Sequence, residues 1–249
     1  MATYTDPYEI KTVKERIFGN PYVGRGIIVG LTKDVRKAVI AYFIMGRSAN
    51  SRNRIFVKDG ENIMIRPFDE SKVEDPSLII YYPVRTVGNT LIVTNGDQTD
   101  TIADLCSGSN DLDTCTFVEA LRTREFEPDG PNWTPRISAA LDLKPSDNFR
   151  YDMNILKSAD REGNACNRFF FEYEGIPGEG HFLHTYQTDG NPIPTFIGEP
   201  ERVAIPDDID SLTDEIWSNL DEDNKISLYV RYIDLIGEEY EERLINKYE

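Results

Sequence analysis

The stretch Lys37-Ala-Val-Ile-Ala-Tyr-Phe-Ile-Met45 indicates the class of fold. It is a short apolar run rich in β-branched and aromatic residues, which are more frequent in strands than in helices. A second run of the same kind, Gly26-Ile-Ile-Val-Gly-Leu31, precedes it, and turn-forming residues separate the two. We therefore predict that this part of the chain forms strands and contains no long helix.

Two turn signals support the same interpretation for the residues that follow. Asp59-Gly60 and Gly88-Asn89 each lie between two apolar runs, as expected for the tight turn of a β-hairpin. Strands are predicted at 22–31, 37–45, 55–57, 63–66, 78–87, 90–94, 137–143, 149–156, 167–173 and 181–188.

Helices are predicted between the two groups of strands and at the C-terminal end. One short helix is expected at 99–105. A second is expected to begin at Thr116-x-x-Glu119, which has the form of a capping box. The order of strands, helices, strands and helices predicts an α+β protein rather than alternating βαβ units.

The C-terminal segment is predicted to be helical and acidic. Residues 211–248 are interpreted as two or three helices, with Gly237 as a break. Their buried side is expected to consist of Ile216, Leu220, Val230, Ile233 and Ile236. We expect one domain over residues 1–249, with residues from about 206 to 249 as its acidic helical portion.

The composition argues against several classes of protein. A net charge of −17 argues against binding to long nucleic acids, because a duplex binder needs a basic face. No apolar run approaches the length of about 18 residues that a membrane span needs, and the N-terminal residues do not resemble a signal peptide. The three cysteines, Cys106, Cys115 and Cys166, predict neither a disulfide framework nor a zinc site, which fits a cytoplasmic protein. With only two histidines, a histidine-rich metal site is not expected.

One loop concentrates polar groups on a stiff backbone. The segment Arg124-Glu-Phe-Glu-Pro-Asp-Gly-Pro-Asn-Trp-Thr-Pro-Arg-Ile137 carries three carboxylates, an amide, a hydroxyl and two arginines among three prolines. Proline lacks a backbone donor and fixes φ, so the segment is neither a regular helix nor a central strand. We interpret it as the rim of a pocket, with an acidic surface connection as the alternative.

Two further segments offer hydrogen-bond donors. Gly46-Arg-Ser-Ala-Asn-Ser-Arg-Asn-Arg54 follows an apolar strand and is interpreted as a phosphate cradle, or else as an exposed basic turn. Asn95 and Gly96 end another strand, where they can meet a polar ligand or form an Asx turn.

These segments together resemble the archaeal-type IMP cyclohydrolase family. The similarity rests on Tyr22-Val-Gly-Arg-Gly-Ile-Ile-Val-Gly, on Arg47-Ser48 and Asn53-Arg54, and on Val93-Thr-Asn-Gly-Asp-Gln-Thr-Asp-Thr-Ile-Ala-Asp104. It continues in Phe126-Glu-Pro-Asp, Asn132-Trp-Thr-Pro-Arg-Ile, His184-Thr-Tyr186 and Phe196-Ile-Gly-Glu-Pro200, in family order over roughly residues 20 to 200.

The resemblance implies a fold, a reaction and a set of residues. The fold is a four-layer αββα sandwich resembling N-terminal-nucleophile hydrolases. The reaction is the dehydrative closure of 5-formamidoimidazole-4-carboxamide ribonucleotide to IMP in purine biosynthesis, with no metal or organic cofactor. Arg54, Tyr81 and Glu127 match the family's catalytic arginine, tyrosine and glutamate. The substrate-binding motifs contain Arg47, Ser48, Asn95, Gly96, Asn132, Thr134 and Arg136.

The chain departs from the family pattern in three places. It has extra residues around 49–52, a tryptophan before Thr134, and the C-terminal extension, which leaves open whether the protein is a homo-oligomer. Two alternative functions remain. One is a nucleotide-binding or regulatory protein on a cyclohydrolase scaffold. The other is an N-terminal-nucleophile amidohydrolase, against which the Met-Ala-Thr start argues.

Overall fold

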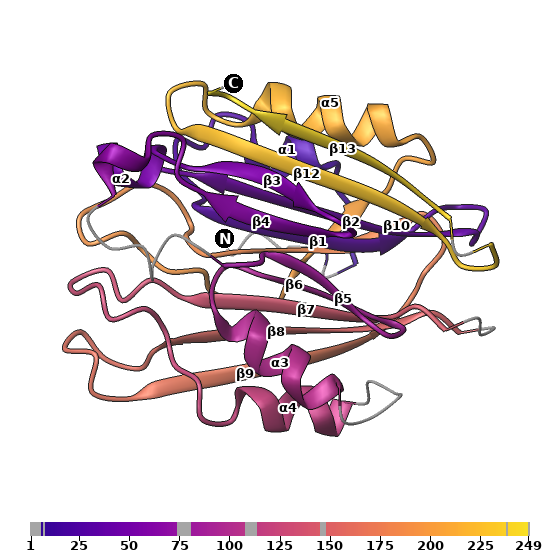
Figure 1. Ribbon diagram of the computed structural model, residues 1–249, viewed down its shortest axis with the longest axis horizontal. Coiled ribbons are helices and arrows are strands. Elements are labelled where there is room, and N and C mark those ends of the chain that lie inside the picture. Colours follow the sequence, from indigo (N-terminus) through magenta and orange to yellow (C-terminus); the bar gives the residue numbers. More distant parts are fainter. Residues whose placement is uncertain are drawn as a thin grey trace.

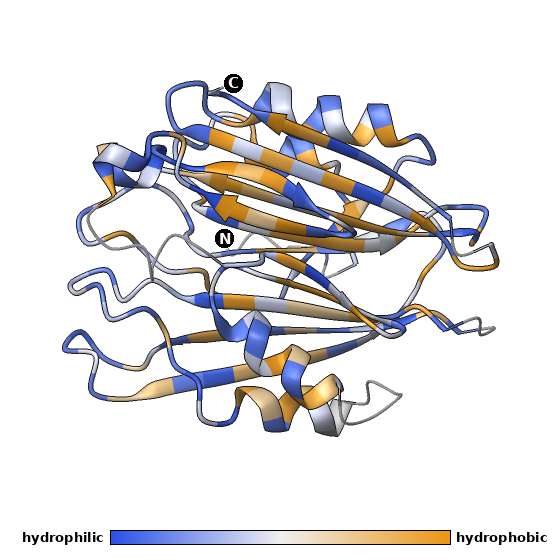
Figure 2. Ribbon diagram, viewed as in Figure 1, coloured by the Kyte–Doolittle hydropathy of each residue, from blue (hydrophilic) through white to orange (hydrophobic). Residues whose placement is uncertain are grey.

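Two antiparallel sheets form the centre of the molecule, and helices cover their outer faces (Figure 1). The structure is a computed structural model that describes residues 6, 8–73, 81–107, 114–144, 148–237 and 239–248. The strands are largely apolar, whereas the loops that join them are mostly hydrophilic (Figure 2). The prediction of an α+β protein is confirmed.

The first sheet has six strands in the order β11-β10-β1-β2-β12-β13. All neighbouring strands within it are antiparallel. Its strands are β1 (Arg25–Leu31), β2 (Lys37–Met45), β10 (Glu179–His184), β11 (Glu201–Ala204), β12 (Lys225–Asp234) and β13 (Tyr240–Asn246).

The second sheet has seven strands in sequence order, from β3 to β9, and is also antiparallel. The two predicted hairpin turns are confirmed, because Asp59-Gly60 joins β3 to β4 and Gly88-Asn89 joins β5 to β6. The strands are β3 (Ile55–Asp59), β4 (Asn62–Arg66), β5 (Val84–Val87), β6 (Thr90–Thr94), β7 (Arg136–Asp142), β8 (Arg150–Ser158) and β9 (Cys166–Glu174). Residues 78–80 of the strand predicted at 78–87 lie outside the described residues.

Helices pack on the outer face of each sheet. The helices α1 (Val13–Ile17) and α5 (Ile209–Asn219) cover the first sheet, and α3 (Gln98–Cys106) and α4 (Thr114–Leu121) cover the second. The predicted helix at 99–105 is therefore confirmed as α3. The predicted capping box is wrong, because α4 begins at Thr114 and Thr116 lies inside it. The short α2 (Ala49–Arg52) lies between β2 of the first sheet and β3 of the second, and the 3-10 turn η1 (Glu70–Lys72) follows β4.

The prediction that the C-terminal segment is helical is wrong beyond α5. Residues after Asn219 form the hairpin of β12 and β13 instead. Strand β12 is buried on both faces, so its apolar residues form a nearly continuous run without alternation. Leu228 and Val230 therefore face the helices, while Tyr229 faces the second sheet. Ile236 was expected to be buried, but its side chain is 77% exposed.

The space between the sheets holds the main core, and it also receives one charged side chain from β1. Ile27 and Val29 of this strand face the second sheet, whereas Ile28 faces the helices. Because strand side chains alternate between the two faces, Arg25 points in the same direction as Ile27. Arg25 is therefore a buried charge at the beginning of β1, between the two sheets.

Candidate functional site

Three segments that are distant in sequence meet at one end of the sheets, where they form the rim of the site (Figure 1). They follow β2, precede β7 and follow β10. The side-chain oxygen of Asn132 accepts a hydrogen bond from the backbone N–H of Ile193 at 3.1 Å. The hydroxyls of Thr134 and Tyr186 share another hydrogen bond. The Pro-rich loop that the sequence singled out is thus joined to the loop that follows β10.

Two arginines are buried at this end of the core. Arg25 and Arg54 are each only 8% exposed, and the Nε atom of each has no hydrogen-bond partner. Burial lowers the pKa of Arg54, and the positive charge of Arg25 lowers it further. Burial also opposes the charge on Arg25, but Glu127 and the nearby tyrosines together outweigh this effect and raise the pKa of Arg25. A buried polar group without a partner is costly, so these guanidinium groups are suited to receive an anionic or polar ligand.

A pair of tyrosines lies beside the arginines. The Tyr81 hydroxyl lies 3.2 Å from the Tyr42 hydroxyl, and both side chains are buried. Burial raises the pKa of Tyr81, although Arg25 and Arg54 oppose this effect, and burial also raises the pKa of Tyr42. Both phenols therefore stay protonated near neutral pH and can donate a hydrogen bond. Phe56 stacks on Tyr42 with ring centroids 5.5 Å apart, so an aromatic ring packs against the tyrosine pair.

The Pro-rich loop contributes a carboxylate beside Arg25. Oε1 of Glu127 lies 3.9 Å from Nη2 of Arg25, and the Glu127 side chain is 17% exposed. The Glu127 backbone N–H donates to the Thr134 carbonyl at 2.9 Å, which closes the loop on itself. Asp129 accepts from both the backbone N–H and the hydroxyl of Thr134 at 2.6 and 2.5 Å. Thr134 therefore holds the loop, while the Glu127 carboxylate remains available near the arginines.

The structure brings together the three residues that the sequence assigned to catalysis. Tyr81 and Glu127 both oppose the lowering of the Arg54 pKa, and Arg54 in turn opposes the rise of the Tyr81 pKa. Such a set can donate hydrogen bonds to an oxygen that becomes negative and can accept a proton on a carboxylate.

Two further residues of this site were missed by the sequence prediction. Arg25 lies in a strand that is otherwise apolar, and Tyr42 lies inside the run that indicated the fold. A charged residue within a buried strand was the available signal for Arg25. For Tyr42, the sequence carries no such signal, because buried tyrosines are common in cores.

The predicted phosphate cradle lies at the rim of the site. Arg47 pairs with the Asp189 carboxylate, donates to the Gly190 carbonyl at 2.9 Å, and lies over the Tyr22 ring at 5.2 Å. Ser48 caps α2 and its hydroxyl lies 3.0 Å from the Ser51 hydroxyl. Both residues are exposed, so a ligand that enters from solvent can reach them.

Asn95, Gly96 and Arg136 form a second polar cluster around the start of α3. The Asn95 side chain donates to the Pro135 carbonyl and accepts from the Ile137 N–H, at 2.9 and 2.8 Å. Arg136 donates to the Gln98 side chain at 2.9 Å and lies 3.0 Å from the Asp97 carboxylate. A Cβ atom on Gly96 would lie 1.6 Å from the Arg136 guanidinium, so glycine is needed here for the arginine to pass.

This second cluster lies on a different side of the second sheet from Arg54 and Tyr81. Arg136 shares its face of β7 with Ala140, which faces α3 and α4, whereas Ile137 faces the space between the sheets. An open pocket of about 280 Å³ adjoins the cluster. Its lining consists of Thr123, Arg124, Glu125, Phe126 and Arg136.

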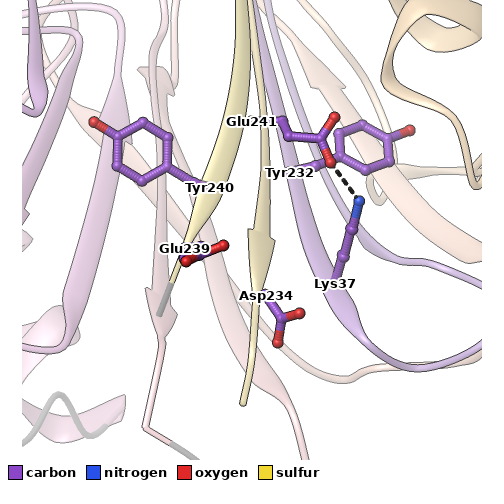
Figure 3. A pocket seen from close by; sticks show the side chains of 6 residues that line it. All are labelled: Lys37, Tyr232, Asp234, Glu239, Tyr240 and Glu241. Carbon is purple, nitrogen blue, oxygen red and sulfur yellow. Dashed lines mark hydrogen bonds and ion pairs between the residues drawn. The ribbon is translucent and has the colours of Figure 1, made fainter. Parts of the chain in front are cut away.

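A smaller pocket of about 110 Å³ lies on the first sheet beside the turn between β12 and β13, and Figure 3 shows its side chains. Lys37 donates to the Glu241 carboxylate at 2.6 Å across it. The Asp234 carboxylate accepts from the backbone N–H groups of Ile236 and Gly237, each at 2.9 Å. These charges are already matched within the protein, so this pocket lacks the unpartnered groups of the site between the sheets.

Across the described residues, no three or more histidine, cysteine, aspartate or glutamate side chains are placed to hold a metal ion. No helix in the same part of the chain is long and apolar enough to cross a membrane. Cys106 and Cys166 are free thiols, and the side chain of Cys115 lies outside the described set.

Comparison with known proteins gives consistent matches. Residues 22–239 match the family described as IMP cyclohydrolase-like protein. An IMP cyclohydrolase of Methanococcus aeolicus is 31% identical over 173 residues, which cover 64% of this chain and 82% of the relative. The IMP cyclohydrolase of Methanopyrus kandleri is 29% identical over 186 residues, which cover 70% of this chain and 89% of the relative. The IMP cyclohydrolase of Methanococcus maripaludis strain C6 is 31% identical over 190 residues, which cover 74% of this chain and 91% of the relative.

Proposed function

Because the chain belongs to the IMP cyclohydrolase-like family, we propose that it catalyses the ring closure that gives IMP. The carboxamide nitrogen of 5-formamidoimidazole-4-carboxamide ribonucleotide attacks the formyl carbon. One proton from that nitrogen and one from the formamido nitrogen then leave with the formyl oxygen as water. No cofactor takes part in this proposal, since no electrons are transferred.

The observation that carries the proposal is the pair of buried guanidinium groups beside the Tyr81 hydroxyl. The formyl oxygen becomes negative when the carboxamide nitrogen attacks. Donors that are already oriented in a site of low dielectric stabilise such a charge strongly. We assign Arg54 and Tyr81 to this oxygen, with Arg25 as a second positive charge.

The base in this mechanism is the Glu127 carboxylate. An amide nitrogen is a weak nucleophile, since its lone pair is delocalised into the carbonyl, and its attack therefore requires removal of a proton. Glu127 lies beside Arg25 at 3.9 Å and is 17% exposed, so the substrate can reach its carboxyl group directly or through water. Asp129 is engaged with Thr134 and is less suited to the role.

The remaining predicted residues are proposed to hold the ribonucleotide. Arg47 and Ser48 lie exposed at the rim and are assigned to the 5′-phosphate, for which Arg47 would leave Asp189. Asn132 and Thr134 hold the two rim loops together. Because Asn95, Gly96 and Arg136 lie on another side of the second sheet from Arg54, we assign them an indirect role, in which they hold the start of β7 in place beside the substrate site.

We also propose that the protein is one domain with the fold of N-terminal-nucleophile hydrolases. The chain enters the first sheet with β1 and β2, builds the second sheet from β3 to β9, and returns to the first with β10, so the first sheet needs both flanking parts of the chain. The order of helices, two antiparallel sheets and helices supports the likeness.

One assay tests the proposed reaction. Purified protein is mixed with the formamido ribonucleotide, and ring closure is followed by the change in ultraviolet absorbance. Turnover that disappears with Glu127→Gln supports the proposal. Binding of IMP without turnover in the wild-type protein would contradict it and favour the regulatory alternative. Release of ammonia from amide substrates would instead favour the amidohydrolase.

A further inference from the structure

The C-terminal strand contacts the strand that follows Arg54. Strand β13 is the edge of the first sheet, and β3 is the edge of the second sheet. The Asn246 side chain of β13 accepts a hydrogen bond from the Phe56 N–H at 2.8 Å and donates to the Phe56 carbonyl at 3.0 Å. A side-chain amide therefore binds both backbone groups of one β3 residue, as a neighbouring strand would.

The Asn246 amide is itself held in place. Its oxygen also accepts from the Ser227 hydroxyl at 2.7 Å, and Ser227 is fully buried on β12. Nearby contacts join the same two sheets, because Lys58 pairs with Glu242 and the Arg231 guanidinium donates to the Glu61 carbonyl at 2.5 Å. A group fixed by several hydrogen bonds can fix its partner in turn.

Phe56 connects this contact to the candidate active site in two ways. It lies two residues after Arg54, across the first peptide of β3. Its ring also stacks on Tyr42, whose hydroxyl meets the hydroxyl of Tyr81. The match to the family ends at residue 239, so β13 lies beyond the matching part of the chain.

We propose that Asn246 is a positioning residue, which holds Phe56 and thereby places Arg54 and the Tyr42–Tyr81 pair for the reaction. The proposal rests on the proposed function. A displacement of catalytic groups by about 1 Å can lower a rate by up to about a hundredfold. Asn246→Ala removes both bonds to Phe56, and we expect kcat to fall at least about tenfold while KM changes less than about threefold.

Leu244→Ala provides the matched control. Leu244 lies on the same strand and on the same face, where it packs against the core between the sheets, but it does not touch Phe56 through a hydrogen bond. Its truncation lowers the melting temperature without releasing β3. Should Asn246→Ala fail to fold, Asn246→Asp is tested instead. Aspartate has nearly the same shape as asparagine, but it places an acceptor oxygen beside the Phe56 carbonyl in place of the donor, so the same fall in kcat is expected.

The experiment measures kcat, KM and melting temperature for the wild-type protein and these variants. A loss of kcat in the Asn246 variants, with Leu244→Ala within about threefold of the wild type, supports the positioning role. Equal kcat in all of them, or losses that follow melting temperature alone, would overturn it. An inactive wild-type protein would instead count against the proposed reaction. In that case hydrogen exchange at the Phe56 amide tests whether Asn246 holds the backbone of Phe56. Unchanged protection of this amide in Asn246→Ala would refute the positioning role.

Discussion

Nη2 of Arg25 lies 3.9 Å from Oε1 of Glu127, and the two side chains are only 10% and 17% exposed. Arg25 comes from the first sheet and Glu127 from the loop that precedes β7 of the second. Since opposite charges attract more strongly where water is excluded, we expect this contact to orient the carboxylate that we propose as the base and to connect the two sheets.

Arg25→Met should therefore lower kcat by about a hundredfold, which corresponds to about 2.7 kcal/mol of transition-state stabilisation. The methionine keeps much of the side-chain volume but neither the charge nor the donors. Steady-state kinetics at saturating substrate measure the effect. Arg150→Met serves as the control, since Arg150 forms an exposed pair with Glu174 and should leave kcat unchanged. Near-normal kcat in folded Arg25→Met would leave Arg25 with a structural role only.

Glu127→Gln should lower kcat at least about a hundredfold with the fold intact, because the amide cannot accept the proton. Glu125→Gln is the control, as Glu125 lies on the same loop but faces Arg168 at 3.8 Å. Circular dichroism checks the fold and the absorbance assay gives kcat. If Glu127→Gln retains its rate, the base is Asp129 or Glu125 and Glu127 only holds the loop.

Tyr81→Phe should lower kcat by about tenfold, since one donor to the formyl oxygen is lost while the arginines remain. Tyr42→Phe should have a smaller effect of the same kind, because its hydroxyl reaches the substrate only through Tyr81. In a double-mutant cycle the two changes should be less than additive. Strictly additive losses would show that the two hydroxyls act independently.

Arg47→Ala should raise KM by about ten- to a hundredfold and leave kcat nearly unchanged, as expected when a charged hydrogen bond to phosphate is lost. The Arg47–Asp189 pair provides a second test, because the carboxylate competes with the phosphate for the same guanidinium. Asp189→Asn should lower KM. An unchanged KM in both variants would place the phosphate elsewhere, and the pocket beside Arg124 and Arg136 would be the next candidate.

The fold was predictable from sequence where local chemistry determines it. Asp59-Gly60 and Gly88-Asn89 adopt positive φ at their glycines, so both hairpins followed from two residues each. The C-terminal hairpin was not predictable in the same way. Val230 and Ile233 are spaced as on a helix, but β12 is buried on both faces, and only the packing of α5 and the second sheet produces that burial.

The candidate site was predictable only in part, for a related reason. Arg54, Tyr81 and Glu127 came from the family resemblance, and the structure places them together. The position of Arg25 beside Glu127 depends on how two sheets pack, which no local pattern records. Arg136 shows the opposite outcome: the resemblance assigned it to the substrate-binding motifs, but it turns towards α3 while its neighbour Ile137 faces the core.

A last prediction concerns stability and His181. This side chain is 5% exposed, stacks on Tyr173 with centroids 3.6 Å apart, and shares a hydrogen bond of 2.6 Å with the Tyr151 hydroxyl. Burial, with a contribution from the positive charge of Arg202, lowers the pKa of His181 to about 4. Between about pH 6.5 and about pH 4 the unfolded chain therefore binds a proton that the folded protein does not. The contribution of neutral His181 to the free energy of unfolding is therefore complete above pH 6.5. It decreases by about 3 kcal/mol as the pH falls to about 4.

Urea unfolding at about pH 7 and about pH 4.5 measures this loss in the wild-type protein and in His181→Gln. The glutamine cannot take up a proton, so the variant should be less stable at neutral pH but should lose about 2–3 kcal/mol less on acidification. Carboxylates that titrate in the same range affect both proteins equally and cancel in the comparison. An identical dependence on pH in the two proteins would mean that His181 is already protonated in the folded state at pH 4.5, and that the Tyr151 and Tyr173 rings do not keep it neutral.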